Sequence, residues 1–161
     1  MIQIGIIREE KSPVDHRVPI TPEQAAQIEK DFPGVKIKVQ SSSARCYPDD
    51  DYRKQGIEIG ASVIDCDILM GVKEVPISSL IDDKTYLFFS HTIKKQAYNR
   101  NLLCSVLEKN IRLIDYEALI NEQGGIISDW QGKSLGLESD GKVIASIEEN
   151  HHKRTLRYLN Q

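Results

Sequence analysis

Ionisable side chains gather in clusters that directly follow apolar segments of this chain. The clusters occupy residues 8–11, 15–17, 73–74, 90–92 and 115–117. They include arginine, which can bind a carboxylate through two parallel hydrogen bonds, lysine, which offers a point charge, and histidine, which exchanges protons near neutral pH. If the clusters meet, they could bind a small acidic metabolite and move a proton to or from it. The residue types therefore favour acid–base chemistry on a carboxylate-bearing molecule.

Arg17, Lys73 and His91 are the residues that we expect to carry this chemistry. Each has an ordinary alternative explanation, since the loops of any soluble protein carry charges, and Lys73 alone could be such a surface residue. His91 lies directly after an apolar segment, where a surface role is a weaker explanation. Glu74 and Glu117 could tune the lysine and the histidine, or could simply pair with surface cations. The meeting of several clusters, more than any single residue, supports a functional site.

The apolar segments before the clusters have the lengths and compositions of buried strands. Residues 2–7, 66–72 and 85–89 are short apolar runs, typical of strands that are covered on both faces. Residues 111–114 form another strand of this kind. Residues 35–39 instead alternate apolar residues with lysines, which predicts an edge strand whose lysines face water.

Helices are predicted between these strands. Thr21, Pro22 and Gln24 form a capping-box pattern at the start of one helix. Residues 49–56 place acidic residues first, basic residues later and a glycine last, which is the order of a short helix, and residues 95–109 form a longer amphipathic helix. Strands that alternate with helices over short connections predict an α/β fold with a doubly wound, mostly parallel sheet. Ligands of such sheets bind beyond the carboxyl ends of the strands, which is where the ionisable clusters fall.

Composition limits the classes of partner. The chain has 161 residues, a net charge of −3 and a pI near 5.8, so we expect neither nucleic acid nor an anionic membrane as its main partner. Its three cysteines, at positions 46, 66 and 104, have neither the number nor the spacing of a disulfide framework or a zinc site, and no metal is expected. The N-terminal apolar run is too short for a signal sequence or a spanning helix, which predicts a cytoplasmic location.

Two regions of the chain differ in character. Residues 1–123 hold all of the strands, helices and clusters described above, whereas residues 124–161 are glycine-punctuated and only weakly periodic, with one possible helix over residues 142–160. His151 and His152 in this tail are more simply explained as exposed helix residues than as metal ligands, since no third ligand has a suitable spacing. We therefore expect an α/β domain over residues 1–123 and a divergent C-terminal appendage.

Several stretches around the clusters match a known pattern when they are taken together. They are Ile-Ile-Arg-Glu-Glu-Lys at 6–11, Asp-His-Arg-Val-Pro-Ile-Thr-Pro at 15–22, Gly-Val-Lys-Glu-Val-Pro at 71–76, Phe-Phe-Ser-His-Thr at 88–92 and Leu-Ile-Asp-Tyr-Glu at 113–117. On these motifs residues 1–123 resemble the N-terminal, substrate-binding domain of the alanine dehydrogenase, NAD(P) transhydrogenase and saccharopine dehydrogenase superfamily. The surroundings of His91 look most like those of the NAD-dependent, lysine-forming saccharopine dehydrogenases.

The resemblance implies roles for the predicted site residues. Lys73 and His91 would serve in acid and base steps, and Arg17 would bind a substrate carboxylate, with Glu74 and Glu117 as further substrate-binding residues. In saccharopine dehydrogenases the reaction oxidises a secondary amine to an imine by hydride transfer to NAD and then hydrolyses it to lysine and 2-oxoglutarate. Alanine dehydrogenase uses the same three positions for alanine and pyruvate. The resemblance therefore implies an amino acid or a 2-oxo acid as the small-molecule ligand, in lysine metabolism.

The sequence departs from this family beyond residue 124. No Gly-x-Gly-x-x-Gly pattern follows a strand anywhere, so the pyrophosphate of NAD has no glycine turn and helix N-terminus to bind. Because hydride transfer needs the cofactor held against the substrate, we expect the chain alone to bind no cofactor and to have no dehydrogenase activity. Two alternatives stay open. One is a non-catalytic interaction module, or a small binding module for amino acids or 2-oxo acids, that could form homo-oligomers; the other is one half of a split enzyme completed by a separate dinucleotide-binding chain.

Overall fold

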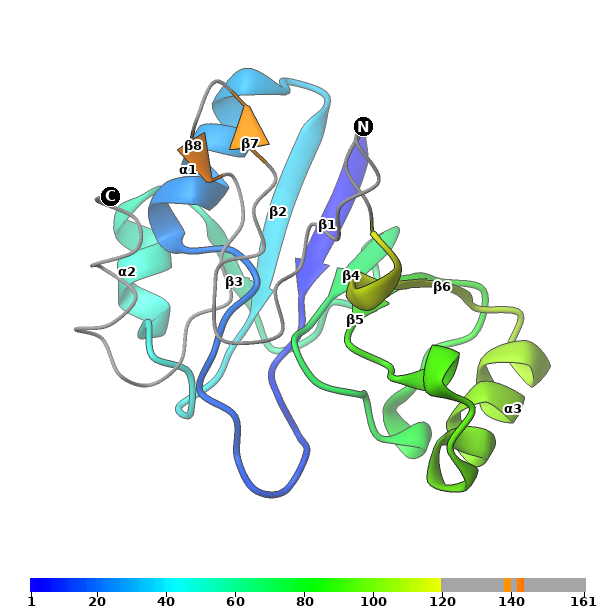
Figure 1. Cartoon of the computed structure of the whole chain (residues 1–161). Helices are drawn as coiled ribbons and strands as arrows, with labels where there is room; N and C mark the ends of the chain where they lie inside the picture. Colours follow the sequence, from blue (N-terminus) through cyan, green and yellow to red (C-terminus); the bar gives the residue numbers. More distant parts are fainter. Residues whose placement is uncertain (120–137, 140–141, 144–161) are drawn as a thin grey trace.

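A six-stranded parallel sheet forms the centre of the protein in this computed structural model, which describes residues 1–119, 138–139 and 142–143 (Figure 1). The strands are β1 (Ile2–Ile6), β2 (Val35–Gln40), β3 (Glu58–Gly60), β4 (Ile68–Met70), β5 (Thr85–Phe88) and β6 (Arg112–Asp115). Their order across the sheet is β3-β2-β1-β4-β5-β6, and each neighbouring pair is parallel. The chain adds strands on one side of β1 and then on the other, which confirms the predicted doubly wound, parallel sheet.

Three α-helices and four short 3₁₀ helices connect the strands within the described residues. They are α1 (Pro22–Asp31), α2 (Asp49–Lys54), α3 (Arg100–Glu108), η1 (Ile77–Ser79), η2 (Thr92–Lys94), η3 (Ala97–Asn99) and η4 (Tyr116–Ala118). The predicted capping box is present at the start of α1. The Thr21 hydroxyl accepts the N–H of Gln24, and the Gln24 side chain accepts the N–H of Thr21. This reciprocal pair satisfies N–H groups that the first turn of a helix leaves unpaired.

The single helix predicted over residues 95–109 is wrong at its start. Lys95 has a φ of +53°, in the left-handed region, and α3 begins only at Arg100, after the separate turns η2 and η3. A right-handed helix cannot pass through such a residue. The spacing of apolar residues reports which side of a segment is buried, but it does not report one reversed backbone angle.

The prediction that the strand at residues 35–39 is an edge strand is also wrong. β2 lies between β1 and β3, and the edge position belongs to β3, a strand of three residues that no pattern in the sequence predicted. The alternating lysines of β2 have another explanation. Lys36 Nζ contacts Glu29 Oε2 at 2.6 Å, and Lys38 Nζ contacts Asp65 Oδ2 at 2.8 Å. They mark a strand face covered by ion pairs rather than an open edge.

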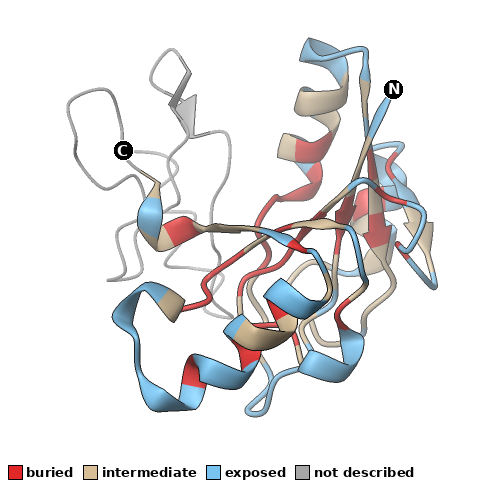
Figure 2. Ribbon diagram, turned by 90° about the vertical axis from the view of Figure 1, so that its right-hand side faces the viewer, coloured by how far each residue is buried: buried red, intermediate tan, exposed pale blue. Residues whose placement is uncertain are grey.

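Two buried clusters lie on opposite faces of the sheet. α1 and α2 pack on the face that includes Ile6 and Met70, and α3 packs on the face that includes Leu69 and Phe88. Leu69 and Met70 are neighbours in β4, so their separation into two clusters is the alternation expected of a strand between two layers. Figure 2 shows that buried positions follow the central strands and the sides of the helices that face them.

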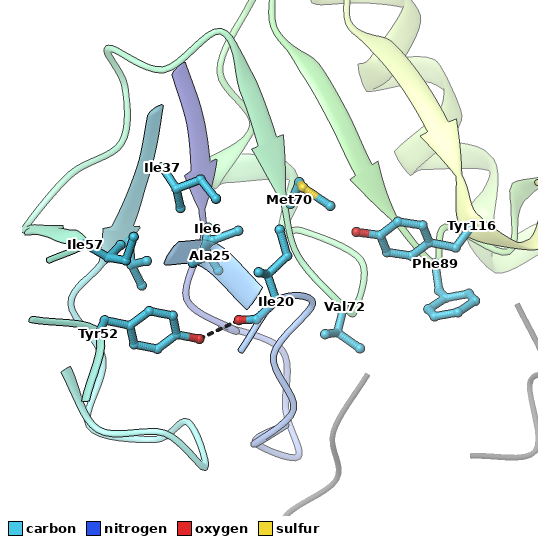
Figure 3. Close-up of a cluster of buried hydrophobic side chains, with 11 residues drawn as sticks. Ile6, Ile20, Ala25, Ile37, Tyr52, Ile57, Met70, Val72, Phe89 and Tyr116 are labelled. Atoms are coloured by element: carbon cyan, nitrogen blue, oxygen red, sulfur yellow. Dashed lines mark hydrogen bonds between the residues drawn. The ribbon is translucent and has the colours of Figure 1, made fainter. Parts of the chain in front are cut away.

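Tyr52 anchors α2 to the first of these clusters. Its ring is fully buried, and its hydroxyl donates to the carbonyl oxygen of Ile20 at 2.7 Å (Figure 3). Changing Tyr52 to phenylalanine should lower the free energy of unfolding by about 1.5 kcal/mol, because the Ile20 carbonyl would lose a buried donor. Urea denaturation of both proteins measures this difference. A matched control is Tyr98→Phe, because the Tyr98 side chain is exposed and loss of its hydroxyl should cost little stability. Equal losses of stability in the two variants would contradict the role assigned to Tyr52.

Most of the predicted C-terminal appendage lies outside the described residues. The described part consists of β7 (Glu138–Ser139) and β8 (Lys142–Val143), which pair antiparallel. The range 142–160, in which the sequence predicts one possible helix, begins with the two residues of β8, and the rest of that range lies outside the described residues. The boundary predicted at residues 123 and 124 and the pair His151 and His152 lie outside them as well. Among the described helices, none has the length and apolar composition needed to cross a bilayer.

Candidate functional site

The carboxyl ends of β1, β4, β5 and β6 lie side by side, because these strands are successive neighbours in a parallel sheet. Backbone hydrogen bonds continue the alignment past the strands. The Ile7 N–H donates to the Met70 carbonyl at 2.9 Å, and the Phe89 N–H donates to the Val72 carbonyl at 3.0 Å. The ionisable clusters that follow these four strands therefore emerge at one edge of the sheet.

Arg17 and Lys73 meet at a shared carboxylate. Arg17 Nε and Nη2 donate to the two oxygens of Asp15 at 2.9 and 2.6 Å, and Lys73 Nζ lies 3.9 Å from Asp15 Oδ2. The Asp15 and Arg17 side chains are only 10% and 16% exposed. The structure thus brings together Arg17 and Lys73, two of the three residues predicted to carry the chemistry, around an aspartate for which no role was predicted.

The shared carboxylate stays ionised at neutral pH. Burial alone would raise the pKa of Asp15, but the hydrogen bonds from Arg17 and the nearby charge of Lys73 outweigh burial, and the pKa lies below its usual value. Asp15 therefore orients the Arg17 guanidinium through a bidentate contact and partly balances the positive charge of Lys73.

Glu9 contacts the segment that carries Lys73. Its Oε1 accepts the N–H of Val72 at 2.6 Å, and its Oε2 accepts the N–H of Lys73 at 3.0 Å. Burial raises the pKa of Glu9 to about 7, although both backbone hydrogen bonds lower it. Sequence reasoning missed this residue because Glu9 and Glu10 look equivalent in the sequence, and no local pattern identifies partners that lie 63 and 64 positions away.

His91 is fixed by contacts on several sides. Its Nδ1 lies 3.0 Å from Glu117 Oε1, and Lys94 Nζ donates to the same oxygen at 2.8 Å. The imidazole stacks on the Phe89 ring, with centroids 6.3 Å apart, and the Asn99 side chain donates to the His91 carbonyl at 3.0 Å. The Lys94 ammonium group lies 3.3 Å from the same ring nitrogen, so a carboxylate and a cation together hold the imidazole in orientation at Nδ1.

Glu117 contacts His91 through Oε1, and its second oxygen, Oε2, could still accept a hydrogen bond. Burial would raise its pKa, but Lys94 and His91 outweigh burial, and the pKa of Glu117 lies below its usual value. Its backbone N–H donates to Asp115 Oδ1 at 2.9 Å, which holds the residue at the start of η4. Its Oε2 is buried and has no hydrogen-bond partner among the described residues.

Glu74 points to a different cation. Its Oε2 lies 2.5 Å from Lys11 Nζ, a residue of the loop after β1. Of the two explanations that the sequence left open for Glu74, this contact corresponds to pairing with a nearby cation. The role of Glu74 in substrate binding stays a prediction.

Two hollows lie at this edge of the sheet, with Glu9 in the lining of both. One has a volume of about 180 Å³ and is lined by Lys73 and Tyr86 among others. The other, about 10 Å³, is lined by Arg17 and Arg45 among others and has room for one water molecule at most. His91 is in neither lining, so the Arg17 and Lys73 cluster and the His91 cluster form two parts of the same edge. In the part of the chain that the structure describes, no three His, Cys, Asp or Glu side chains are grouped as metal ligands would be.

Comparison with known proteins identifies the family. Residues 5–128 match the family described as alanine dehydrogenase/PNT, N-terminal domain. The chain belongs to this family. The match spans strands β2 to β6, the end of β1 and every candidate site residue, which confirms the resemblance drawn from the motifs.

Relatives of this alanine dehydrogenase/PNT N-terminal domain include enzymes of lysine metabolism. Alpha-aminoadipic semialdehyde synthase, mitochondrial, from Mus musculus is 38% identical over 132 residues, which cover 80% of this chain and 14% of that protein. The Arabidopsis thaliana alpha-aminoadipic semialdehyde synthase is 34% identical over 125 residues, covering 75% and 12%. Saccharopine dehydrogenase [NAD(+), L-lysine-forming] from Yarrowia lipolytica is 23% identical over 148 residues, covering 83% and 38%. The chain thus matches only 14% of the length of the first of these relatives.

Solved structures show the same fold at low identity. An L-alanine dehydrogenase superposes with a TM-score of 0.61 at 16% identity, covering 78% of this chain and 35% of that one. A transhydrogenase from Sinorhizobium meliloti superposes with a TM-score of 0.57 at 19% identity, covering 71% and 35%. These similarities show that the sheet and its helices share the fold of these proteins.

The described residues do not fit the dinucleotide site that an NAD-dependent enzyme requires. β1 ends in a loop over residues 7–21 rather than in a glycine turn that opens a helix, and the first N–H groups of α1 face the capping box formed by Thr21 and Gln24. A dinucleotide pyrophosphate binds where such a turn exposes backbone N–H groups at a helix N-terminus. We therefore derive no hydride-transfer step from residues 1–119.

Proposed function

We propose that this alanine dehydrogenase/PNT N-terminal domain is the substrate-binding part of a saccharopine- or alanine-dehydrogenase-like oxidoreductase of amino-acid metabolism, with lysine metabolism as its setting. The observation that supports this most is the pairing of Arg17 and Lys73 with one buried carboxylate, at the same sheet edge as the His91–Glu117 pair. The names of the relatives from mouse, Arabidopsis and Yarrowia support lysine metabolism as the setting.

Arg17 would bind a carboxylate of the ligand. Asp15 binds the Nε–Nη2 side of the guanidinium and orients it for this contact. Bidentate or charge-assisted contacts of this kind fix both the position and the orientation of a small acid. The ligand class that this predicts is an amino acid or a 2-oxo acid.

Lys73 and His91 would act as proton carriers on the bound molecule. Glu117 contacts Nδ1 of His91 and would hold the imidazole in orientation for this role. Glu117 itself could accept a hydrogen bond from a ligand amine through its buried Oε2. Glu74 would contribute negative charge near the Lys73 hollow.

Hydride transfer would depend on a dinucleotide site outside residues 1–119. The Yarrowia relative is named as an NAD(+) enzyme, and we infer that NAD would be bound by another part of the polypeptide or by a separate chain. Residues 1–119 alone would then bind the small molecule without oxidising it. We also propose a cytoplasmic location, which fractionation would test against the mitochondrial location in the name of the mouse relative.

The second candidate is an interaction module, and one surface feature favours it. Ile93, Tyr98, Leu103 and Leu107 are large apolar residues of the η2–α3 segment, and each is exposed. Exposed apolar side chains of this kind are typical of protein–protein contacts. Homo-oligomers or a separate dinucleotide-binding chain would be the partners, and light scattering on the purified chain would reveal self-association.

Titration of the purified chain with lysine, saccharopine, 2-oxoglutarate, alanine and pyruvate tests the binding function. We expect a dissociation constant of about 1 mM for at least one of them, with shifts at the amide resonances of Lys73 and His91, since an isolated charged contact of this size supports about 4 kcal/mol of binding. Lys73→Met should weaken binding about tenfold, and the exposed helix residue Lys30 serves as the matched control for loss of a lysine. An absence of amide shifts at millimolar concentrations of all five ligands would count against the proposal.

A further inference from the structure

Glu9 holds the backbone of the segment after β4 at the point where β1 and β4 separate. The last backbone bond between the two segments runs from the Ile7 N–H to the Met70 carbonyl, at 2.9 Å. Beyond it, the N–H groups of Val72 and Lys73 donate to the Glu9 carboxylate at 2.6 and 3.0 Å. A side chain thus supplies the acceptors after the backbone pairing ends, and it binds two consecutive N–H groups at once.

The glycine at position 71 lies close against the Ile7 and Glu9 side chains. A Cβ atom there would lie 2.7 Å from Ile7 Cδ1 and 3.3 Å from Glu9 Oε1. The first distance is shorter than packed carbon atoms allow. Gly71 therefore leaves the space in which the Ile7 and Glu9 side chains lie against the neighbouring strand.

Glu9 also lines two hollows of the site. It is in the lining of the hollow that includes Lys73 and in the lining of the hollow that includes Arg17. Several titratable groups interact electrostatically with Glu9 or share the lining of these hollows with it, including Tyr86 of β5. The others are Arg8, Glu10, Asp15 and Arg17 from the loop after β1, Arg45 from the loop after β2, Lys73 and Glu74 after β4, and Tyr116 from η4.

We propose that Glu9 is a positioning residue, which fixes the backbone of Lys73 so that the Lys73 ammonium group stays beside Asp15 and at the hollow it lines. The hydrogen bonds from the Val72 and Lys73 N–H groups to Glu9 do not depend on the proposed function. The consequence for a ligand rests on the function proposed above, because it assumes that Lys73 contacts the bound molecule.

The carboxylate is suited to this task because it offers two oxygens with full negative character. Hydrogen bonds from N–H groups to a charged acceptor are stronger than those to a neutral one. A glutamine at position 9 keeps the length of the side chain but has only one acceptor oxygen, so it can serve only one of the two N–H groups well. Glu9→Gln therefore weakens the contact while changing the volume of the site very little.

Amide resonances of the wild-type chain test the contact directly. We expect the Val72 and Lys73 amide signals to shift together as pH rises from 5 to 9, with a common midpoint near 7, because both N–H groups bind the carboxylate that titrates. In Glu9→Gln this shared transition should disappear, whereas Glu10→Gln should keep it. Glu10 is the matched control because it bonds to Arg8 and Ser79 instead. Independent or absent transitions at the two amides of the wild type would overturn the proposal.

Ligand affinity tests the consequence for the site. Titration with 2-oxoglutarate at pH 8 should show affinity about tenfold weaker in Glu9→Gln than in the wild type, the effect of losing one charge-assisted hydrogen bond, and no more than about twofold weaker in Glu10→Gln. Equal affinity of Glu9→Gln and the wild type would overturn the positioning role. If the wild type binds none of the small acids, the proposed function fails, while the shared amide transition still decides whether Glu9 holds the Lys73 backbone.

Discussion

Replacing Arg17 with methionine should lower the free energy of unfolding by about 3 kcal/mol and weaken the binding of a carboxylate ligand about 100-fold. The loss of stability follows from the Asp15 carboxylate, which would remain in a site where its side chain is only 10% exposed. A buried charge that loses its partner costs more than the pair contributed, because the remaining ion is left poorly solvated. The loss of affinity follows from the bidentate or charge-assisted contact that the proposed function assigns to Arg17.

Denaturant unfolding at pH 7 measures the first effect, and titration with 2-oxoglutarate measures the second. The matched control is Arg53→Met, which removes an arginine from an exposed pair with Asp50, whose side chains are 54% and 76% exposed, and should cost less than about 0.5 kcal/mol. Adding Asp15→Asn to Arg17→Met should restore part of the stability, because the asparagine removes the unpaired charge. It should not restore the affinity, because it does not replace the donor lost with Arg17. Equal losses in Arg17→Met and Arg53→Met would show that the Asp15–Arg17 pair has no special role.

The parts of the fold that the sequence could predict are those specified by local chemistry. The capping box needs only Thr21 and Gln24, and the central strands need only short apolar runs between loops. The predictions that proved wrong concern features that depend on the rest of the fold. β3 is too short to show a pattern, and the left-handed angle at Lys95 is set by how η2 and η3 pack rather than by residue type. The identity of an edge strand is likewise a property of the whole sheet.

Some residues of the candidate site could likewise be selected from the sequence, and others could not. Arg17, Lys73 and His91 could be selected from the sequence because each follows a strand of a parallel sheet, and that topology brings such positions to one edge. Their partners could not be selected. Asp15 and Glu9 have many acidic neighbours of equal appearance, and only the three-dimensional arrangement shows which carboxylate meets Arg17 and which meets the Lys73 backbone.

The stability of the wild-type chain should contain a contribution from Glu9 that falls as pH rises from about 4.5 to about 7. Burial raises the folded-state pKa of Glu9 from 4.5 to about 7, so the folded state binds this proton more tightly than the unfolded state does. Stability decreases with pH wherever the folded state holds more protons, and the contribution is therefore fully present below pH 4.5 and lost as the pH passes 7. Allowing for the partial exposure of the side chain, the loss should amount to about 2 kcal/mol.

The difference in unfolding free energy between the wild type and Glu9→Gln isolates this contribution. Other groups titrate alike in both proteins and cancel, so the difference curve, measured by urea denaturation from pH 4 to 8.5, should fall through the window between 4.5 and 7 and then become flat. Glu10→Gln should give a difference of the opposite sign, confined to more acidic pH, because hydrogen bonds from Ser79 and Arg8 lower the pKa of Glu10. A flat Glu9→Gln difference curve between pH 4.5 and 7 would mean that Glu9 titrates as an exposed carboxyl, and the Lys73 backbone would then lack the buried acceptor that its position at the site requires.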